Sequence, residues 1–370
     1  MRIIICAFAL LATLFACGDK TSSDRCPVAV VGNQLFSPEE VWLSDVASDM
    51  KIIPLETNDS CLIGRGLEFQ IRDEGILFRD VGLLLFDAKG QFVKTLFNIG
   101  PGPDEVDGLL DYSIRDSLIY ITTLSYQCRV YNFRGELKDR YKIPVFTNGF
   151  AALGDGKFIS AMYGWGDGEI SGRVEFFDKE RVIKILNKPY STEGSIPDSY
   201  PMGKEAKFTF FTGETYMKET LCDTIYKIDV DNDTIQPVLA YDFGKWKSDP
   251  TKRYNVPVQE LFMKIPYTIF LGLSKQSIYL TTMSADINKQ ESIEALCIYD
   301  RMNNTARTVR LAYSKEDVAK IKSVLKDGFD VEKYKYFVPT SLSADGEYIC
   351  ALIQQTNDNN PAIIAVRLKQ

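Results

Sequence analysis

The chain of 370 residues contains no histidine. This absence excludes Ser-His-Asp and Cys-His nucleophile systems, zinc sites of the HExxH type and histidine general bases. The catalytic chemistry that remains uses carboxylate pairs, a tyrosine or lysine nucleophile, or oxygen ligands to calcium. The composition therefore favours a non-catalytic protein without a cofactor, with calcium as the one cofactor left open.

Basic charge is also scarce. The chain has 43 Lys and Arg against 50 Asp and Glu, a net charge of −7, and the two signs are interspersed rather than gathered in blocks. A protein that binds nucleic acid needs a basic surface to neutralise phosphates. We therefore expect no nucleic-acid partner. The hydrophobic share of 45% suits a globular protein.

The first segment, "MRIIICAFALLATLFAC", has one positive charge followed by an apolar run over residues 3–15. The run is too short to span a bilayer and is typical of a signal peptide. Its ending "LFAC" resembles the bacterial lipobox, although Phe15 fits that motif imperfectly. We expect cleavage after residue 16 and acylation of Cys17, which would anchor the protein to a membrane of the cell envelope. An ordinary signal peptide is the alternative, and the periplasmic and surface-exposed locations both stay open.

The polar run after Cys17 predicts a tether over residues 17–35, followed by one domain over residues 36–370. Beyond the leader and Cys17, six cysteines remain without any CxxC spacing, and several lie in apolar segments: Cys26, Cys61, Cys128, Cys222, Cys297 and Cys350. An exported chain permits disulfides. Buried free thiols are the interpretation we favour, with one unassigned pair left open.

A repeat is visible in the turns. Short apolar segments end in an aromatic or aliphatic residue followed by Asp or Asn, at Asp87, Asn132, Asp178, Asp229 and Asp300. Such Asx residues suit the start of a tight turn. Other segments, such as "GILFRDV" and "SIYLTTM", are rich in β-branched and aromatic residues and precede these turns. A period near 45 residues with four short strands per unit indicates a β-propeller.

The repeat divides the chain into an all-β, six-bladed propeller of four-stranded antiparallel blades. Five blades are predicted over residues 66–97, 108–143, 149–186, 207–243 and 267–312. The last blade has only three strands after Phe337, so we expect residues 50–56 to supply its outer strand beside the segment 362–369. Such closure removes a free sheet edge.

The segments "IPLETNDSCLIG", "LLLFDAKGQFVKTLFNIGPGPDEV", "DTIYKID" and "NPAIIAVRLK" resemble those of the six-bladed β-propeller lipoproteins of Bacteroidales-type bacteria. These are distantly similar to NHL-repeat propellers. The resemblance covers the whole mature chain and implies the propeller fold and a location in the cell envelope, at the outer membrane. It implies no particular chemistry, because fold does not settle function.

The glycine-rich stretch "NIGPGPDEVDGL" (98–109) joins the first predicted blade to the second. In the resembled family a "G-x-G-P-G-E" loop occupies this place. Here Gly100, Gly102 and Pro103 match, and Asp104 stands where the family has Gly. A tight crossing between blades is the interpretation we favour. A ligand-binding role for Asp104 and Glu105 is the alternative.

The long connections of the predicted propeller lie on one face. In a meander, the connections between blades share a face with those between the second and third strands. These connections are residues 164–172, 187–207, 244–264 and 314–336. Function concentrates on loops held by a rigid scaffold, so we expect the binding site on this face. The candidate ligand-binding residues are Trp165, Asp167, Glu169, Trp246, Arg253 and Tyr254. Exposed aromatic rings beside charged groups suit a sugar or peptide, whereas both indoles could instead fill gaps between loop and blade.

One of these connections predicts a short helix. Ser314 and Asp317 suit an N-terminal cap, Val318, Ile321 and Leu325 form an apolar stripe, and Gly328 marks the end. We expect the stripe to cover the propeller core. Docking of a partner is the alternative.

These features favour a membrane-anchored binding or scaffolding module that presents one propeller face to a glycan, peptide or protein partner. The alternative is a propeller hydrolase, lyase or lactonase that uses carboxylates or calcium in the central channel. Glu68, Arg72, Asp111 and Arg115 are the residues that could line that channel. Three or more carboxylates around one point would favour the enzyme, whereas hydroxyls, amides and apolar groups would favour the binding module.

Overall fold

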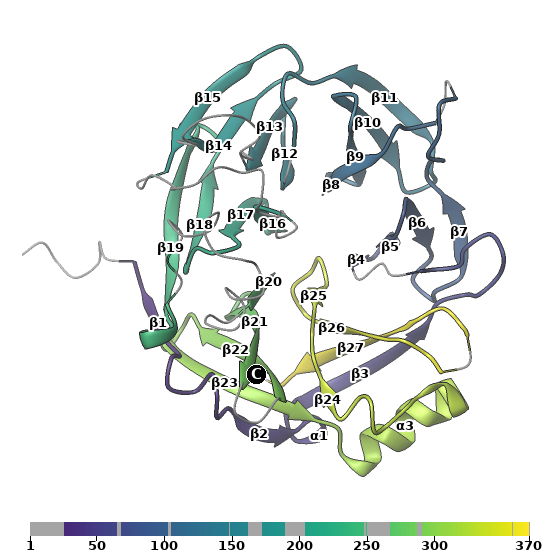
Figure 1. Ribbon diagram of the computed structural model, residues 1–370, viewed down its shortest axis with the longest axis vertical. Helices are drawn as coiled ribbons and strands as arrows, with labels where there is room; N and C mark the ends of the chain where they lie inside the picture. The colour runs from purple at the N-terminus through teal and green to yellow at the C-terminus, as the bar shows by residue number, and fades with distance from the viewer. Residues whose placement is uncertain are drawn as a thin grey trace, which may run out of the picture.

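The computed structural model describes residues 26–64, 68–102, 105–147, 149–161, 172–188, 204–247, 249, 267–286, 291–356 and 358–369. Within them the chain forms six antiparallel sheets arranged as blades around a central axis (Figure 1). Each blade has four strands in meander order. The fold is therefore the predicted six-bladed β-propeller.

The first three blades follow the predicted boundaries closely. Their strands, from the axis outward, are β4 (Glu68–Arg72), β5 (Gly75–Arg79), β6 (Leu83–Phe86) and β7 (Phe92–Thr95); β8 (Leu109–Arg115), β9 (Leu118–Thr123), β10 (Gln127–Asn132) and β11 (Leu137–Lys142); and β12 (Phe150–Gly154), β13 (Lys157–Ala161), β14 (Gly172–Phe177) and β15 (Val182–Asn187).

The other three blades complete the ring. The fourth has β16 (Ala206–Phe211), β17 (Glu214–Glu219), β18 (Thr224–Asp229) and β19 (Thr234–Asp242); the fifth has β20 (Tyr267–Leu273), β21 (Ser277–Asp286), β22 (Glu291–Asp300) and β23 (Thr305–Ala312); and the sixth has β25 (Ser341–Leu342), β26 (Ile349–Ile353), β27 (Ala362–Leu368) and β3 (Ala47–Pro54).

The ring closes as the sequence predicts. Strand β3 pairs antiparallel with β27, in a register that runs from Ala362 opposite Pro54 to Leu368 opposite Ala47. The N-terminal part of the domain thus supplies the outer strand of the last blade. Figure 1 shows the purple strand β3 beside the yellow strand β27.

The N-terminal segment also forms a strap that the sequence does not predict. Strand β1 (Val28–Val30) pairs in parallel with β19, and β2 (Glu39–Trp42) pairs in parallel with β23. Leu35, between them, is fully buried. The expected tether extended to residue 35, but residues 28–35 belong to the folded domain because they pack on the fourth and fifth blades.

The hydrophobic core lies between the blades. Six clusters of buried side chains each join two neighbouring blades, and strand β6 is buried along its whole length. This explains why strands such as "LLLF" show no alternation of apolar and polar residues. The six cysteines in the described residues are free, and four of them are buried, as the interpretation of buried thiols expects.

Helix α3 (Lys315–Leu325) confirms the predicted helix and its cap. The Ser314 hydroxyl accepts a hydrogen bond from the Asp317 N–H, and the Asp317 carboxylate accepts one from the Ser314 N–H. Ile321 and Leu325 pack in the core between the fifth and sixth blades. The apolar stripe therefore covers the propeller core rather than docking a partner. A single turn, α1 (Leu43–Val46), and the short η5 (Lys326–Gly328) and β24 (Tyr336–Phe337) flank this region.

Across the described parts of the chain, no helix combines the length and the apolar character that a membrane crossing requires.

Candidate ligand-binding cavity

A cavity of about 710 Å³ lies along the axis of the ring. Its walls are residues of the inner strands of all six blades: β4, β8, β12, β16, β20 and β25. Pockets that bind small ligands commonly have volumes of about 300–1,000 Å³. The cavity is therefore large enough for a small organic ligand.

The charged end of the cavity lies on the face that carries the long connections. Every inner strand starts on this face, because the connection from the preceding blade arrives there. Glu68 is the first residue of β4, Lys207 is the second residue of β16, and Lys204 lies two residues before that strand. The lysines and Glu68 thus sit at one mouth of the cavity.

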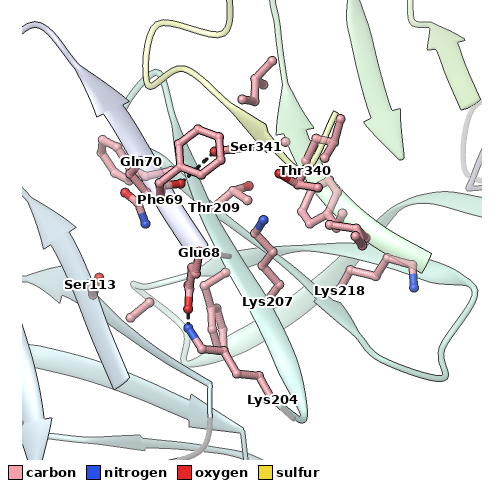
Figure 2. Close-up of a pocket in the computed structure, with 18 of the residues that line it drawn as sticks. Glu68, Phe69, Gln70, Ser113, Lys204, Lys207, Thr209, Lys218, Thr340 and Ser341 are labelled. Atoms are coloured by element: carbon pink, nitrogen blue, oxygen red, sulfur yellow. Dashed lines mark hydrogen bonds and ion pairs between the residues drawn. The ribbon is translucent and has the colours of Figure 1, made fainter. Parts of the chain in front are cut away.

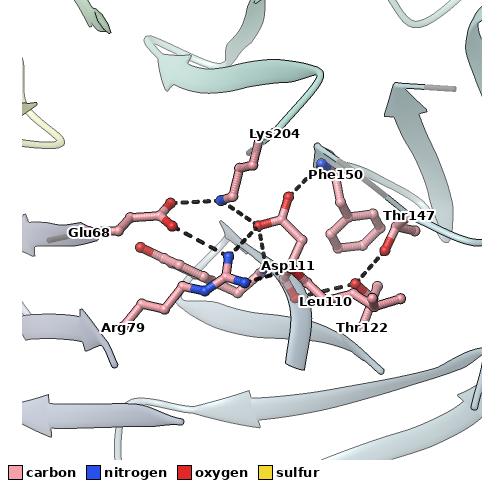
Figure 3. Close-up of polar contacts among 9 residues, drawn as sticks. Glu68, Arg79, Leu110, Asp111, Thr122, Thr147, Phe150 and Lys204 are labelled. Carbon is pink, nitrogen blue, oxygen red and sulfur yellow. Dashed lines mark hydrogen bonds and ion pairs between the residues drawn. The ribbon is translucent and has the colours of Figure 1, made fainter. Parts of the chain in front are cut away.

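An ion-pair network crosses this mouth (Figure 3). The Lys204 Nζ is 2.7 Å from Glu68 Oε1 and 2.5 Å from Asp111 Oδ1, although these residues come from the fourth, first and second blades. Arg79 is 3.4 Å from each of the same two carboxylates. The network therefore connects three blades across the axis.

Asp111 is the buried centre of this network, with only 2% of its surface exposed. Its carboxylate accepts hydrogen bonds from the backbone N–H groups of Phe150 and Tyr112, both at 2.8 Å. A buried carboxylate is tolerated only when it is paired and hydrogen-bonded. Asp111 meets both conditions, so its role is to hold the second and third blades together beneath Lys204.

Glu68 and Lys204 stay charged because each stabilises the other. Burial alone would raise the pKa of Glu68, but the positive charges of Lys204 and Arg79 outweigh that effect and hold the pKa below its usual value. Burial likewise opposes the charge of Lys204, but Asp111 and Glu68 hold its pKa above its usual value. Glu68 and Lys204 are therefore both charged at neutral pH.

Lys207 lies beside this network but takes no part in it. No described residue is within hydrogen-bonding or ion-pairing distance of its Nζ, and Figure 2 shows the side chain pointing into the cavity, away from the Lys204–Glu68 pair. Burial, with the nearby Lys204, lowers the pKa of Lys207 to about 8, against the opposing effect of Glu68. Lys207 is thus an ammonium at neutral pH that has no counter-ion.

Lys218, near the end of β17, adds a second ammonium to the same wall. It is 4% exposed, and its Nζ donates hydrogen bonds to Thr268 Oγ1 at 2.8 Å and to the Glu219 carbonyl at 3.2 Å. An ammonium has three N–H donors, so one remains. Burial holds the pKa of Lys218 below its usual value, despite the acids and the Cys222 thiol around it.

The cavity carries an excess of positive charge, in contrast to the whole chain. Eight ionisable acidic or basic side chains line it: Glu68, Arg72, Arg79, Asp80, Lys204, Lys207, Lys218 and Glu219. Five are cationic and three are acidic, whereas the chain has a net charge of −7. Outside the lining, Arg173 pairs with Glu219, Glu74 pairs with Arg72, and Asp111 pairs with Arg79 and Lys204. Lys207 and Lys218 are the lining cations that form no ion pair among the described residues, so an anion is favoured beside them.

Farther from the mouth, neutral polar groups and apolar groups replace the charges. Gln70, Ser113, Thr209 and Thr340 come from four different blades and line the middle of the cavity (Figure 2). At the opposite end the Arg115 guanidinium lies 4.1 Å from the Phe210 ring centroid, a contact between the second and fourth blades that narrows the channel.

The sequence of residues 27–361 matches the model of a family described as "Domain of unknown function (DUF4934)". The chain belongs to the DUF4934 family. This match covers nearly all of the folded domain, from the strap to the residue before β27 of the sixth blade. No curated protein matches the sequence.

A solved structure from Bacteroides shows the same fold as this DUF4934 chain. A crystal structure from Bacteroides fragilis NCTC 9343, described as a "Putative exported protein", is 15% identical with a TM-score of 0.64; the match covers 94% of this chain and all of that one. The propeller domain of Cps50 (Swd1) from Myceliophteria thermophila is 8% identical with a TM-score of 0.40, and covers 87% of this chain and all of that one. At these identities the likeness concerns the fold alone.

Two of the predicted site residues can be placed, and neither lines the cavity. Trp246 ends the short helix η3 (Gly244–Trp246), is partly buried, and its ring centroid is 4.3 Å from that of Phe36 in the strap. The indole fills a gap between loop and blade, which is the alternative that the sequence left open. The Glu105 carboxylate accepts a hydrogen bond from the Gly102 N–H at 2.8 Å. It therefore stabilises the tight crossing between the first two blades.

The remaining predicted ligand-binding residues lie outside the described residues: Asp104, Trp165, Asp167, Glu169, Arg253 and Tyr254. The same holds for the lipidation residue, Cys17. Their assigned roles stay predictions.

Of the four residues suggested for the channel, Glu68 and Arg72 line the cavity, Asp111 lies directly behind the mouth, and Arg115 narrows the far end. Sequence reasoning missed Arg79, Lys204, Lys207 and Lys218. For Lys207 a signal exists, because it is a charged residue at the second position of an inner strand, where the neighbouring blades have Ala151 and Thr268. For Lys204 no local signal exists, since its partners come from two other blades.

The acids near the mouth do not form a metal-type cluster. Among the described residues there is no group of three or more Asp, Glu, Cys or His side chains that could hold a metal ion together. Glu68 and Asp111 are instead shared between Arg79 and Lys204. The lining thus combines cations and three carboxylates with hydroxyls, an amide and apolar groups.

Proposed function

We propose that this protein is a membrane-anchored, extracytoplasmic binding module that takes an acidic group of a glycan, peptide or protein partner into the central cavity. The "LFAC" ending at Cys17 supports the anchor. The fold shared with a protein described as exported is consistent with the location. The cavity and its charge support the binding role.

The observation that carries the proposal is Lys207. An ammonium that has no ion-pair partner among the described residues is costly in a cavity, because burial penalises the charge and the more distant Glu68 offsets this only in part. The structure tolerates such a group where a ligand completes it. A carboxylate or similar anion at this position would pair with Lys207.

The Lys204 network prepares the site for that ligand. Arg79 and Lys204 already neutralise Glu68 and Asp111, so these acids do not pair with Lys207. Because the charged groups are held by neighbouring blades, little reorganisation is needed when an anion enters. The site is therefore preorganised for a negative group and accessible from the face that carries the long connections.

The carboxylate-based enzyme receives less support from this arrangement. A glycosidase-type mechanism needs one carboxyl group that is protonated and one that is free to act as nucleophile or base. Glu68 has a lowered pKa, and both Glu68 and Asp111 are engaged with two cations. These two acids are suited to positioning Lys204 rather than to proton transfer.

A binding experiment on the chain from residue 26 onward tests the proposal. Calorimetry would compare small carboxylates (citrate, malate and glucuronate) with neutral glycerol and glucose. We expect carboxylates to bind, and Lys207→Gln to weaken binding tenfold or more while the thermal unfolding midpoint is kept. Lys142→Gln, at an exposed position of the outer strand β11, is the matched control. Equal binding of neutral compounds, or unchanged binding to Lys207→Gln, would refute the proposal.

A further inference from the structure

The middle of the cavity carries polar groups that the protein itself does not satisfy. The buried hydroxyl oxygens of Thr209 and Thr340 have no hydrogen-bond partner. Ser113 accepts a hydrogen bond from the Ala152 N–H at 3.1 Å, which leaves its own O–H free to donate. A buried polar group without a partner costs about 1–3 kcal/mol. Such groups from different blades around one cavity point to an occupant with hydroxyl groups.

These neutral groups lie at a defined depth below the ammonium. Lys207 and Thr209 are two residues apart in β16 and so project from the same side of the strand. The rise of a strand places Thr209 about 7 Å deeper than Lys207. Gln70 and Ser113 line the facing walls, from the first and second blades. A rotation about χ1 exchanges the methyl and hydroxyl groups of a threonine, so Thr209 and Thr340 can turn their hydroxyls toward the cavity.

From this arrangement we infer that the ligand is a sugar acid, such as a uronic acid unit, with its carboxylate at Lys207 and its hydroxyls at Gln70, Ser113, Thr209 and Thr340. This inference rests on the proposed function, because it assigns the carboxylate to the same lysine. The oxygens of Glu68 face the same space and can accept a further hydrogen bond from a ring hydroxyl. The cavity volume of about 710 Å³ admits one or two sugar rings.

The inference separates three kinds of ligand. An aliphatic or aromatic acid would pair with Lys207 but leave the threonines unpaired. A neutral sugar would satisfy the threonines but leave Lys207 without a counter-ion. A sugar acid satisfies both layers at once. Specificity of this kind is large, because a site built around buried polar groups rejects a ligand that cannot pair with them.

The test uses calorimetry on the chain from residue 26 onward with four probes: glucuronate, galacturonate, glucose and cyclohexanecarboxylate. We expect at least one uronate to bind tenfold or more tightly than cyclohexanecarboxylate. Replacing both threonines with the isosteric valine (Thr209→Val with Thr340→Val) should weaken the uronate about tenfold and leave cyclohexanecarboxylate within twofold. Lys207→Gln should weaken both acids equally, and circular dichroism confirms that each variant is folded.

The outcomes distinguish this inference from the function on which it rests. If both kinds of acid bind equally and the valine variant changes nothing, the sugar-acid inference is wrong while acid binding stands. If glucose binds as well as a uronate, or if no acid binds and the cavity holds only water, both are wrong. A uronate whose affinity depends on Lys207 but not on the threonines would also overturn the inference.

Discussion

The surroundings of a single side chain in this propeller can change its pKa, and Lys207 is the clearest case. Burial, with the neighbouring Lys204, lowers its pKa to about 8 from an ordinary value of 10.5. Only the protonated form attracts an anion. We therefore expect the affinity for an acidic ligand to be constant between pH 6 and 7 and to fall above pH 8, approaching about tenfold per pH unit.

Calorimetry of glucuronate or citrate across pH 6 to 10 measures this dependence. Lys207→Arg, which stays protonated throughout, should reduce the slope. A flat profile in the wild-type chain would show that Lys207 is not the group that receives the acid.

Glu175, in the third strand of the third blade, gives a prediction for stability. It is 7% exposed, and burial raises its pKa to about 7 from 4.5. The folded state therefore holds a proton that the unfolded state has lost, so stability is full below pH 4.5 and falls as the pH rises to 7. Replacing Glu175 with Gln removes this penalty, and we expect a gain of up to about 3 kcal/mol at pH 8 and little change at pH 4.5.

Urea unfolding at both pH values checks this expectation. Glu180→Gln, at an exposed position in the turn that follows β14, serves as the control and should change stability by less than about 0.5 kcal/mol. The account is contradicted if Glu175→Gln destabilises the protein equally at pH 4.5 and pH 8.

At the scale of elements, helix α3 is stabilised by the face that packs against the fifth and sixth blades. Ile321 is fully buried in the core between the fifth and sixth blades, whereas Val324 on the same helix is 43% exposed. Truncating a buried Ile to Ala costs about 2–5 kcal/mol, because the burial is lost and a cavity remains. We expect this cost for Ile321→Ala and less than about 1 kcal/mol for Val324→Ala. Equal losses in urea unfolding would show that α3 does not cover the core.

The strands and turns could be predicted because their signals are local. Strands such as "LLLF" show no alternation of apolar and polar residues. The Asx residues that start turns, and the β-branched segments between them, nevertheless reveal the repeat length of the blades. The cap of α3 was visible for the same reason, since Ser314 and Asp317 are three residues apart. The final blade could be completed only by counting strands, which pointed to the N-terminal segment.

The strap and the cavity could not be predicted from local sequence signals. Strands β1 and β2 are three and four residues long and pair in parallel with the edges of distant blades, so tertiary contacts decide their conformation. The cavity network joins Lys204 to Glu68, 136 residues earlier in the chain. Closure of the ring alone brings them together. Trp246 looked like a ligand-binding aromatic residue because its partner, Phe36, belongs to the strap that the sequence did not reveal.

At the scale of the whole molecule, ring closure by β3 predicts different folding behaviour for two N-terminally truncated chains. A chain that begins at residue 47 loses the strap, including buried Leu35 and Leu43, but keeps β3. We expect it to fold with a lower thermal midpoint, since burying each leucine contributes about 1.5–3 kcal/mol. A chain that begins at residue 57 also loses β3 and leaves β27 as an unpaired edge, so we expect aggregation and no cooperative transition.

Thermal unfolding followed by circular dichroism, with size-exclusion chromatography, distinguishes these two chains. If the chain from residue 57 unfolds cooperatively at the same midpoint as the chain from residue 47, β3 does not close the ring in the way that its pairing with β27 indicates.

The central claim is that the axial cavity receives an acidic ligand at Lys207, and a crystal structure of the chain from residue 26 onward, grown with the tightest-binding uronate, tests it most directly. The account predicts that the carboxylate lies within about 3 Å of Lys207 Nζ, at hydrogen-bonding distance, with the sugar ring extending toward Thr209. A ligand bound on the outer loops, or a cavity that holds only water at saturating ligand, would contradict it.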